Sequence, residues 1–455
     1  MTHSSYAGSY AIVGGGISGL TAAYKLRRAA GDDALITLFE PAEVLGGTLR
    51  TVSVAGHPVD VGAEAFVVRR PEVGALLAEL GLAGAQIDTT GARPLIYAGG
   101  ALRPFPERTV NGIPTSAESL TGLVDHDTLA HVAGERSRHL QWETGADPTV
   151  EDVVGDRFGA QVVARSVDPL LAGVYAGSAA TIGLRSAAPG VAAALDGGTA
   201  SLTEAANAAV PPVSAGPVFR AVGGGYRRLV DELARQSRVE VVQTAVCRVS
   251  EDRDGWHLAD ASGNDWHADA VALAVPAPRL PPMVADALPS VAAAARRIPV
   301  ASSAVVALAV APGTALPDRS GVLVATGEPL RAKAITLTSR KWGRPDNVEL
   351  LRLSFGRFGD DVARTATDEQ LVVWAIADVS GVFGVTVDPV EVHVARWVDA
   401  MPQYAPGHGA LVAATRASLP PTAALAGNYL DGIGVPACIA SGTAAAERLL
   451  AAVAP

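Results

Sequence analysis

The stretch that decides the fold is Tyr10-Ala11-Ile12-Val13-Gly14-Gly15-Gly16-Ile17-Ser18-Gly19-Leu20. An apolar run stops at three glycines, and a segment from 18 to 29 follows with small and apolar residues on one face. This order predicts a strand, a tight turn and a helix. Gly14, Gly16 and Gly19 fill the GxGxxG spacing, in which glycines permit the turn, the approach of a pyrophosphate and close packing of the helix. The helix N-terminus, with free N–H groups and a positive dipole end, favours the anionic phosphates.

A second strand-like run, residues 34–39, ends in Glu40. This is the distance at which an acidic residue meets the ribose hydroxyls of an adenosine. Glycine-rich turns also occur for purely structural reasons, so the glycine spacing alone is weak evidence. Strand, glycines, helix, strand and acid in this order favour dinucleotide binding over a purely structural turn.

Length and composition indicate a globular protein of two or three domains, with 455 residues of which 49% are hydrophobic and 18% charged. The net charge of -10 argues against a nucleic acid partner, and an anionic ligand would need a local cluster of arginines. Cys247 and Cys438 have no metal or redox spacing, which favours a reducing cytoplasm. No signal peptide is recognisable in residues 1–9.

Membrane spanning is not predicted. The longest uncharged stretch, residues 298–317, is interrupted by prolines and a glycine, so we expect a buried strand within it. Charges are frequent between residues 104 and 200. We therefore expect a soluble protein in the cytoplasm, with at most peripheral contact at the inner face of the membrane.

Paired glycines follow the acidic residue, at Gly46 and Gly47. They let the chain run close along a cofactor, although an ordinary loop and hairpin is the alternative interpretation. GxGxxG, an acid and then paired glycines are typical of FAD-binding proteins of the amine-oxidase type, whereas nicotinamide dehydrogenases lack the second pair. Thr48 stands where arginine or lysine usually follows the glycines, which is a departure from the pattern.

Residues 71–217 are predicted to be an insertion of helix-like segments separated by proline and glycine turns, with helices at 72–80, 127–141 and 151–171. Cofactor-fold patterning returns near residue 223, with a helix at 227–235 and strands at 239–242, 245–249 and 270–275. From 277 to 394 the pattern predicts an antiparallel sheet over a substrate cavity. Its expected elements are strands at 303–310, 321–326, 332–337 and 349–355 and a helix at 368–379.

The predicted fold class is α/β, with a Rossmann-like FAD-binding domain of amine-oxidase type, an α+β substrate domain and a helical insertion domain. The FAD-binding domain is expected to be discontinuous, because cofactor-fold patterning occurs on both sides of the insertion. The expected boundaries are 1–70, 218–276 and 395–455 for the FAD-binding domain, 71–103, 201–217 and 277–394 for the substrate domain, and 104–200 for the helical domain.

The C-terminal segment, residues 425–442, is rich in glycine and leads into a helix that ends near Ala452. Pro436 stands in the first helical turn, where proline is favoured. Such a helix N-terminus could stabilise the flavin edge that gains negative charge on reduction, and the alternative is a helix that only packs. Cys438 is better interpreted as a small buried residue than as a redox centre.

No nucleophilic triad, metal cluster or carboxylate pair stands out, so we assign no catalytic residue and no metal ligand. The flavin itself would carry the redox chemistry. No second GxGxxG for a nicotinamide cofactor occurs, which favours molecular oxygen as the electron acceptor.

The chain resembles the protoporphyrinogen and coproporphyrinogen oxidases of haem synthesis over nearly its whole length. The motifs that carry the resemblance are Ile113-Pro114-Thr115, Gly173-Val174-Tyr175-Ala176-Gly177, Arg396-Trp397, Pro402-Gln403-Tyr404, Gly407-His408, Gly427-Asn428-Tyr429 and the run from Gly434 to Gly442. The resemblance implies that a porphyrinogen is oxidised in three rounds of two-electron transfer to FAD, each followed by reoxidation with O2 and release of peroxide.

The resemblance also implies site residues beyond the glycine turn. Tyr175, Ala176 and Gly177 would face the macrocycle, and Arg93 would bind a propionate. The residues expected to hold FAD are Gly14, Gly15, Gly16, Ile17, Ser18, Gly19, Glu40, Gly46, Gly47, Thr48, Val61, Gly62, Ala63, Glu64, Val246, Trp397, Gly434, Val435, Pro436 and Ile439.

Composition and the missing membrane anchor favour the bacterial coproporphyrinogen III oxidase branch, whose substrate has four propionates and dissolves readily. The alternatives are a protoporphyrinogen IX oxidase and, more distantly, an amine oxidase, a carotenoid desaturase or a non-enzymatic binding protein. Residues 413–426 contain no aromatic residue, whereas amine oxidases of this fold show an aromatic pair there. Extra propionates would need extra cations, for which Arg69, Arg70, Arg93 and Arg103 are candidates. The expected partners are the porphyrinogen, O2 and, for a transient handover, the next enzyme of the haem pathway.

Overall fold

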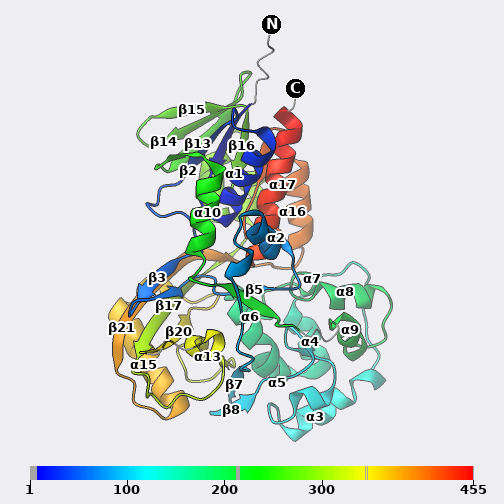
Figure 1. Ribbon diagram of the computed structural model, residues 1–455. Helices are drawn as coiled ribbons and strands as arrows, with labels where there is room; N and C mark the ends of the chain where they lie inside the picture. Colours follow the sequence, from blue (N-terminus) through cyan, green and yellow to red (C-terminus); the bar gives the residue numbers. More distant parts are fainter. Residues whose placement is uncertain (1–7, 212–215, 344, 346, 454–455) are drawn as a thin grey trace.

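A five-stranded parallel sheet forms the centre of one half of the molecule (Figure 1). The computed structural model describes residues 8–211, 216–343, 345 and 347–453. The strand that precedes the glycine turn lies in the middle of the sheet and is almost entirely buried, as expected where both faces of a parallel sheet are covered. In spatial order the strands are β12 (Glu240–Val242), β2 (Leu35–Phe39), β1 (Ser9–Val13), β16 (Ala270–Leu273) and β22 (Ala423–Leu425). Strands far apart in the sequence thus form one sheet, as predicted.

Helices cover one face of this sheet. Apolar residues of β1 and β2 pack there against helices that come from four separate parts of the chain. These helices are α1 (Ile17–Ala30), α2 (Glu72–Glu79), α10 (Arg227–Ser237) and α17 (Val435–Val453). A Cβ atom added to Gly442 would lie 2.3 Å from the Ser18 carbonyl oxygen, so this glycine allows α17 to pack closely on α1.

The opposite face carries a small antiparallel sheet and three helices, which share a core with Val13, Phe39 and Leu273. The elements on this face are β13 (Val246–Glu251), β14 (Trp256–Asp260), β15 (Asp265–Ala268), a 3-10 turn at Ala277–Arg279, α11 (Leu280–Val284), α12 (Pro289–Arg296) and α16 (His408–Ala417). We assigned α2, α11 and α12 to the substrate domain, but they pack against the five-stranded sheet. The domain boundaries themselves stay a prediction.

A seven-stranded sheet forms a second layer (Figure 1). Its order is β21 (Pro389–Pro402), β17 (Val300–Val310), β20 (Glu349–Phe355), β19 (Ala334–Thr336), β18 (Gly321–Val324), β7 (Leu95–Ala98) and β8 (Ala101–Pro104). The antiparallel sheet predicted for residues 277–394 is confirmed, because β17, β18, β19, β20 and β21 pair antiparallel. The sheet is extended by β7, which lies outside that range and pairs with β18 in parallel. The long uncharged stretch forms β17, a buried strand as predicted.

Both faces of the seven-stranded sheet are covered. The hairpin of β3 (Thr51–Val54) and β4 (His57–Asp60) packs on one face of β17, through residues such as Val59 and Val305. On the other face lies α15 (Asp368–Phe383), which begins with a capping box between Thr367 and Gln370. Shorter elements near this sheet are α13 (Thr338–Trp342) and α14 (Val362–Thr365).

A helical region with its own apolar core occupies the side away from α15. Its helices are α3 (His126–Ala133), α4 (Val150–Phe158), α5 (Ala160–Val162), a π-helical turn at Val163–Val167, α6 (Asp168–Tyr175), α7 (Leu184–Ala187), α8 (Pro189–Asp196) and α9 (Leu202–Ala209). Two predicted helices were wrong in length. The helix expected at 151–171 is interrupted at Gly159, whose φ of 90° is left-handed, and the helix expected at 127–141 ends at Ala133 before Gly134.

Short strands connect these layers. One small sheet consists of β5 (Phe66–Val67), β6 (Gln86–Asp88) and β11 (Phe219–Val222). A second consists of β9 (Thr109–Val110) and β10 (Ile113–Pro114). There are 3-10 turns at Ala83–Ala85, Ala117–Leu120 and Glu135–Ser137. In the part of the chain that the structure describes, no helix combines the length and apolar character needed to cross a bilayer.

Candidate functional site

The glycines of the first turn have different structural roles. A Cβ atom on Gly14 would lie 2.5 Å from the Ala274 carbonyl oxygen, and one on Gly19 would lie 1.9 Å from the Gly14 carbonyl oxygen. These two glycines are therefore required by the packing of the protein itself. A Cβ atom on Gly16 would find no protein atom within 4 Å, and Gly16 caps α1 without any side-chain hydrogen bond. The turn thus leaves open space in front of uncapped N–H groups, which fits a diphosphate.

Glu40 lies beside this turn, directly after β2. Its carboxylate accepts hydrogen bonds from the Gly15 N–H at 2.8 Å and from the Ala42 N–H at 3.0 Å. An ionised carboxylate has about four lone-pair sites, so two contacts leave capacity for the hydroxyl groups of a sugar. The predicted ribose contact is compatible with this position.

The second glycine pair lies against the first turn. Gly46 donates a hydrogen bond to the Gly15 carbonyl oxygen at 2.8 Å, and Gly46 and Gly47 have left-handed φ values of 110° and 60°. A Cβ atom on Gly62 would lie 1.7 Å from the Thr48 carbonyl oxygen, so the segment 61–64 runs closely against Thr48. The structure therefore brings together the glycine turn, residues 46–48 and residues 61–64.

Trp397 fixes the segment 61–64 from the other side. Its indole N–H donates to the Val61 carbonyl oxygen at 2.8 Å, and the Arg352 guanidinium donates to the Gly62 carbonyl oxygen at 2.8 Å. Trp397 comes from β21 and Arg352 from β20, so the seven-stranded sheet reaches the predicted flavin segment directly. Ala63 follows Gly62 and donates to the Thr48 carbonyl oxygen at 3.3 Å.

A buried charge cluster accompanies this segment. The Glu64 carboxylate lies 2.6 Å from the Lys341 ammonium and 3.5 Å from the Arg352 guanidinium. Burial alone would raise the pKa of Glu64, but the two cations outweigh it and lower that pKa to about 2. Nearby, burial raises the pKa of Asp60 to about 6, although Thr51 and the Tyr226 N–H donate to its carboxylate. Sequence reasoning missed Lys341 and Arg352; the available signal was a charge inside the apolar strand 349–355.

The C-terminal helix adds a second N-terminus near the first. Helix α17 begins at Val435, with Pro436 in its first turn as predicted, and Ile439 is buried. Because Gly442 meets Ser18 near the start of α1, the N-terminus of α17 extends about 10 Å beyond that contact. Gly434 precedes the helix. Val246 is buried at the start of β13, in the apolar cluster that contains Phe39, the residue before Glu40.

The loop Tyr175–Gly177 is held in a strained form. Ala176 is buried and left-handed, with φ of 50°, which is unfavourable for a residue other than glycine. The Gln403 side chain donates to the Tyr175 carbonyl oxygen at 2.8 Å, and the Phe358 N–H donates to the Ala176 carbonyl oxygen at 2.6 Å. Both carbonyls are thus fixed by other parts of the chain, which is what keeps the strained conformation.

Aromatic side chains connect this loop to the C-terminal segment. The rings of Tyr175 and Tyr404 lie 5.6 Å apart, and the rings of Tyr404 and His408 are stacked at 4.3 Å. The Tyr404 hydroxyl donates to the Asn428 carbonyl oxygen. Three of the motifs that carry the family resemblance, at 173–177, 402–408 and 427–429, therefore meet in space.

Arg93 lies at the surface. Its side chain is 60% exposed and forms an ion pair with Glu107 at 2.5 Å. Arg70 is paired with Glu72, and Arg103 donates to the Ala98 carbonyl oxygen. A propionate contact from Arg93 stays a prediction, and the geometry gives it a competing protein partner.

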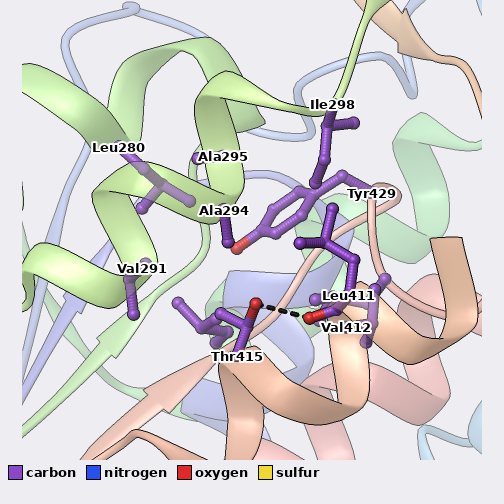
Figure 2. Close-up of a pocket in the computed structure, with 11 residues that line it drawn as sticks. Leu280, Val291, Ala294, Ala295, Ile298, Leu411, Val412, Thr415 and Tyr429 are labelled. Atoms are coloured by element: carbon purple, nitrogen blue, oxygen red, sulfur yellow. Dashed lines mark hydrogen bonds between the residues drawn. The ribbon is translucent and has the colours of Figure 1, made fainter. Parts of the chain in front are cut away.

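A small apolar cavity lies between α11, α12 and α16 (Figure 2). Its volume is about 10 Å³, which is room for about one water molecule and far too little for a porphyrinogen. The Tyr429 ring lines it, and burial raises the pKa of the Tyr429 hydroxyl above its ordinary value.

Cys438 is also buried, and burial raises the pKa of its thiol to about 11, so the reactive thiolate is disfavoured.

Comparison with known proteins adds independent findings. A family model described as flavin containing amine oxidoreductase matches residues 17–450. The chain is similar to the coproporphyrinogen III oxidase of Mycobacterium tuberculosis, with 61% identity over 445 residues and 98% of each chain covered. The coproporphyrinogen III oxidase of Mycobacterium leprae is 60% identical over 446 residues, which cover 98% of this chain and 99% of that protein. Among solved structures, a candidate protoporphyrinogen oxidase from Exiguobacterium sp. is 28% identical with a TM-score of 0.86, over 97% of this chain and 98% of the other.

Proposed function

The chain belongs to the family of flavin-containing amine oxidoreductases, and from that premise we propose that it is an FAD-dependent oxidase that converts coproporphyrinogen III to coproporphyrin III in haem biosynthesis. The observation that carries the proposal is the 61% identity, over 98% of both chains, to a protein named coproporphyrinogen III oxidase. The open space at Gly16 in front of α1 supports the cofactor assignment, because a diphosphate fits there and no side chain of the protein takes its place.

The overall reaction removes six electrons and six protons from the porphyrinogen and reduces three O2 to three H2O2. FAD, when bound, supplies the redox chemistry, accepting two electrons in each round and passing them to O2. The chain itself would bind and orient both molecules. The first turn and residues 46–48 would hold the diphosphate, and Glu40 would hold the ribose. The start of α17 would stabilise the negative charge that develops on reduction.

Residues 61–64 and Trp397 would form the boundary between cofactor and substrate. Trp397 and Arg352 fix the backbone of this segment by hydrogen bonds to Val61 and Gly62. The loop Tyr175–Gly177 would contact the macrocycle, and its two fixed carbonyls would keep that surface in one conformation. Protein groups would therefore exclude water and hold geometry, and the reacting electrons would pass through the flavin.

A protoporphyrinogen IX oxidase is the second candidate. The name of the Exiguobacterium structure favours it, whereas the two mycobacterial relatives, which are far more similar to this chain, favour coproporphyrinogen III. The two substrates differ in that vinyl groups replace two propionates in protoporphyrinogen IX. The choice between them therefore depends on how many carboxylates the substrate site binds.

Further parts of the proposal concern the surroundings of the enzyme. We propose O2 as the electron acceptor and a transient handover of coproporphyrin III to the next enzyme of the pathway. We also propose a cytoplasmic location with at most peripheral membrane contact. Both cysteines, Cys247 and Cys438, are free thiols, which suits a reducing compartment.

Peroxide stoichiometry tests the function. Purified protein loaded with FAD is mixed with anaerobically prepared coproporphyrinogen III, O2 is admitted, and peroxide and porphyrin are measured together. We expect three peroxide molecules for each coproporphyrin III, and apoprotein without FAD should not exceed the nonenzymatic rate. Porphyrin formation that does not depend on FAD would refute the proposal.

A further inference from the structure

Most buried cations of the described chain have an obvious partner. Arg157 pairs with Glu135 at 2.9 Å, Arg340 with Glu349 at 2.9 Å, and Arg352 with Glu64. The Arg27 guanidinium instead donates hydrogen bonds to several carbonyl oxygens near the C-terminal ends of α1 and α10. A buried cation without a counter-charge is destabilising, so the remaining ones need an explanation.

Lys333 and Arg357 are such cations. Lys333 is 5% exposed, and Arg357 is half-buried. Among the residues that the structure describes, no carboxylate lies within ion-pairing distance of either side chain. Burial lowers the pKa of Lys333 to about 7 and also lowers the pKa of Arg357. The Asp360 carboxylate accepts from the Arg357 backbone N–H at 2.8 Å but forms no ion pair with either charged group. Two desolvated cations thus lie together without an acid in ion-pair contact.

The two residues have different geometry. The Lys333 ammonium donates to the Ser303 hydroxyl at 2.9 Å and to the carbonyl oxygens of Phe355 and Gly356 at 3.4 and 2.6 Å. Its three N–H groups are therefore used, and they fix the residue that precedes Arg357. The Arg357 guanidinium donates to the Val324 carbonyl oxygen at 3.0 Å. That bond uses one of five donors, and the others have no partner within the described chain.

Arg357 also lies beside the loop that the proposed function assigns to the macrocycle. The next residue, Phe358, donates its N–H to the Ala176 carbonyl oxygen at 2.6 Å. Asp168, at the start of the helix that ends in this loop, also acts on Arg357, but its carboxylate is occupied by the Ala179 N–H and the Thr326 hydroxyl. The cation therefore faces the junction between the seven-stranded sheet and the helical region.

We propose that Arg357 binds a carboxylate of the substrate, one propionate of the porphyrinogen, and that Lys333 is the residue that positions it. This inference rests on the proposed function, because it takes the Tyr175–Gly177 loop as the substrate surface. A propionate would supply the missing counter-charge, and the planar guanidinium suits a carboxylate. Arg93 differs from Arg357 in burial and in pairing, because its side chain is exposed and already forms an ion pair with Glu107.

The test compares acid and ester ligands. FAD-loaded wild-type protein, Arg357→Gln, Arg357→Lys and Arg93→Gln are titrated with coproporphyrin III and with its tetramethyl ester in one buffer, and binding is followed by porphyrin fluorescence. Glutamine removes the positive charge and keeps a polar N–H donor on a shorter side chain. We expect Arg357→Gln to weaken binding of the acid by about 10- to 100-fold and to leave ester binding within about twofold.

The other variants act as controls. Arg357→Lys should recover part of the lost affinity for the acid. Arg93→Gln tests the other candidate arginine: a loss of acid binding there, with none in Arg357→Gln, would place the propionate at Arg93 and overturn the role of Arg357. Arg357→Gln should also raise KM for coproporphyrinogen III much more than it lowers kcat, because a propionate contact is uniform binding. If Arg357→Gln does not fold with full FAD content, Arg357→Lys is used in its place. We then expect a smaller loss of affinity for coproporphyrin III and no loss of affinity for its ester.

The outcomes separate the inference from the proposed function. Unchanged binding of the acid by Arg357→Gln, or equal losses for acid and ester, would overturn the role of Arg357 while the wild type still oxidises coproporphyrinogen III. A wild-type holoenzyme that neither binds coproporphyrin III nor oxidises its porphyrinogen would overturn the proposed function and this inference with it.

Discussion

At the scale of single residues, the first turn combines glycines that the fold needs with a glycine that faces open space. A side chain at Gly19 would collide with the Gly14 carbonyl oxygen at 1.9 Å, whereas one at Gly16 would meet no protein atom within 4 Å. Sequence spacing identified all three glycines but could not distinguish their tasks. The distinction depends on what lies in front of each residue.

The contrast gives a prediction for cofactor binding. Gly16→Ala should leave the unfolding temperature of the apoprotein nearly unchanged and should lower FAD affinity by about tenfold or more, because the methyl group enters the space of the diphosphate. Flavin absorbance during titration with FAD measures the affinity. Gly84→Ala is the matched control, since a Cβ there also meets nothing within 4 Å. Wild-type FAD affinity in Gly16→Ala would remove the turn from the cofactor site.

Glu64 gives a prediction for pH dependence. Its folded pKa of about 2 lies below the ordinary value of 4.5, so its contribution to stability is fully present above pH 4.5 and is lost as the pH falls toward 2. The contribution is on the order of 3 kcal/mol. Glu64→Gln should therefore be less stable at neutral pH, and the stability difference from wild type should shrink between about pH 5 and pH 2. Chemical unfolding at several pH values measures it, and a constant difference would contradict the account.

Asp60 is the reason to use that difference and not the wild-type curve alone. Its raised pKa of about 6 acts with the opposite sign, because stability then increases as the pH falls from 6 toward 4. Because the Glu64 charge is itself one cause of the raised Asp60 pKa, wild type and Glu64→Gln are compared in an Asp60→Asn background, which removes the Asp60 contribution from both curves. The remaining pH dependence belongs to Glu64 and its two cations.

Ala176 gives a prediction for the substrate loop. Ala176→Gly should relieve the left-handed strain and change the free energy of unfolding by less than about 1 kcal/mol. It should also weaken coproporphyrin III binding by severalfold, since the loop becomes less rigid. Ala55→Gly is the control, because Ala55 has the same φ of 50° in the β3–β4 turn. Equal ligand affinity in the two variants would show that rigidity at residue 176 has no role in binding.

At the scale of elements, sequence patterns predicted regular elements well and interruptions poorly. The strands β1, β2 and β17 and the helix α17 were confirmed, because local apolar periodicity and glycine or proline boundaries specify them. The helix expected at 151–171 is divided at Gly159 and continues through a π-helical turn. One glycine inside a helical pattern does not reveal whether tertiary packing will break the helix.

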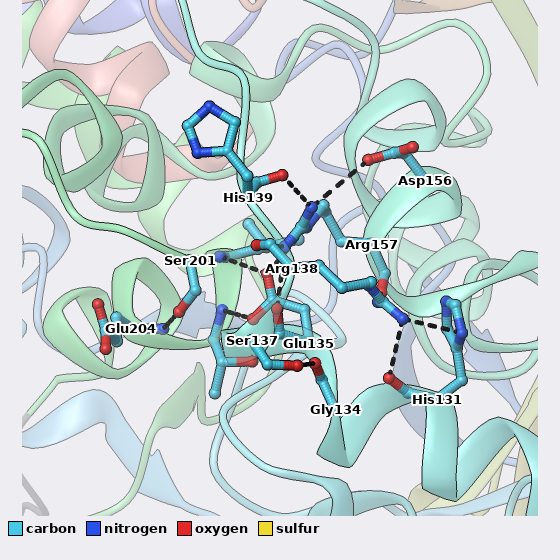
Figure 3. Close-up of polar contacts among 12 residues, drawn as sticks. His131, Gly134, Glu135, Ser137, Arg138, His139, Asp156, Arg157, Ser201 and Glu204 are labelled. Atoms are coloured by element: carbon cyan, nitrogen blue, oxygen red, sulfur yellow. Dashed lines mark hydrogen bonds and ion pairs between the residues drawn. The ribbon is translucent and has the colours of Figure 1, made fainter.

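The helical region depends on a buried ion pair (Figure 3). The Glu135 carboxylate is fully buried and accepts from Arg157 at 2.9 Å and from the N–H groups of Leu202 and Thr203. Glu135→Gln should lower the free energy of unfolding by about 3–5 kcal/mol, because Arg157 would remain buried without its counter-charge. Glu107→Gln, at the exposed pair with Arg93, should change it by less than about 0.5 kcal/mol. Similar losses in chemical unfolding of the two variants would refute this role of Glu135.

At the scale of the whole molecule, contacts between distant parts of the chain create the site. Lys341 and Glu64 are 277 residues apart and Arg352 and Gly62 are 290 apart, yet both pairs lie in contact. The glycine turn, the paired glycines and Pro436 could be predicted because each is a local motif. Lys341, Arg352 and Arg357 could not, because their importance comes from burial and from the partners that folding gives them.

We propose that this chain oxidises coproporphyrinogen III through FAD. The most direct measurement supplies anaerobically prepared coproporphyrinogen III and protoporphyrinogen IX separately to the FAD-loaded protein, admits O2 and follows porphyrin fluorescence with the nonenzymatic rate subtracted. We predict FAD-dependent acceleration of both or of the first alone, with the higher kcat/KM for coproporphyrinogen III. A kcat/KM for protoporphyrinogen IX equal to or above that value, or no FAD-dependent acceleration of either substrate, would contradict the claim.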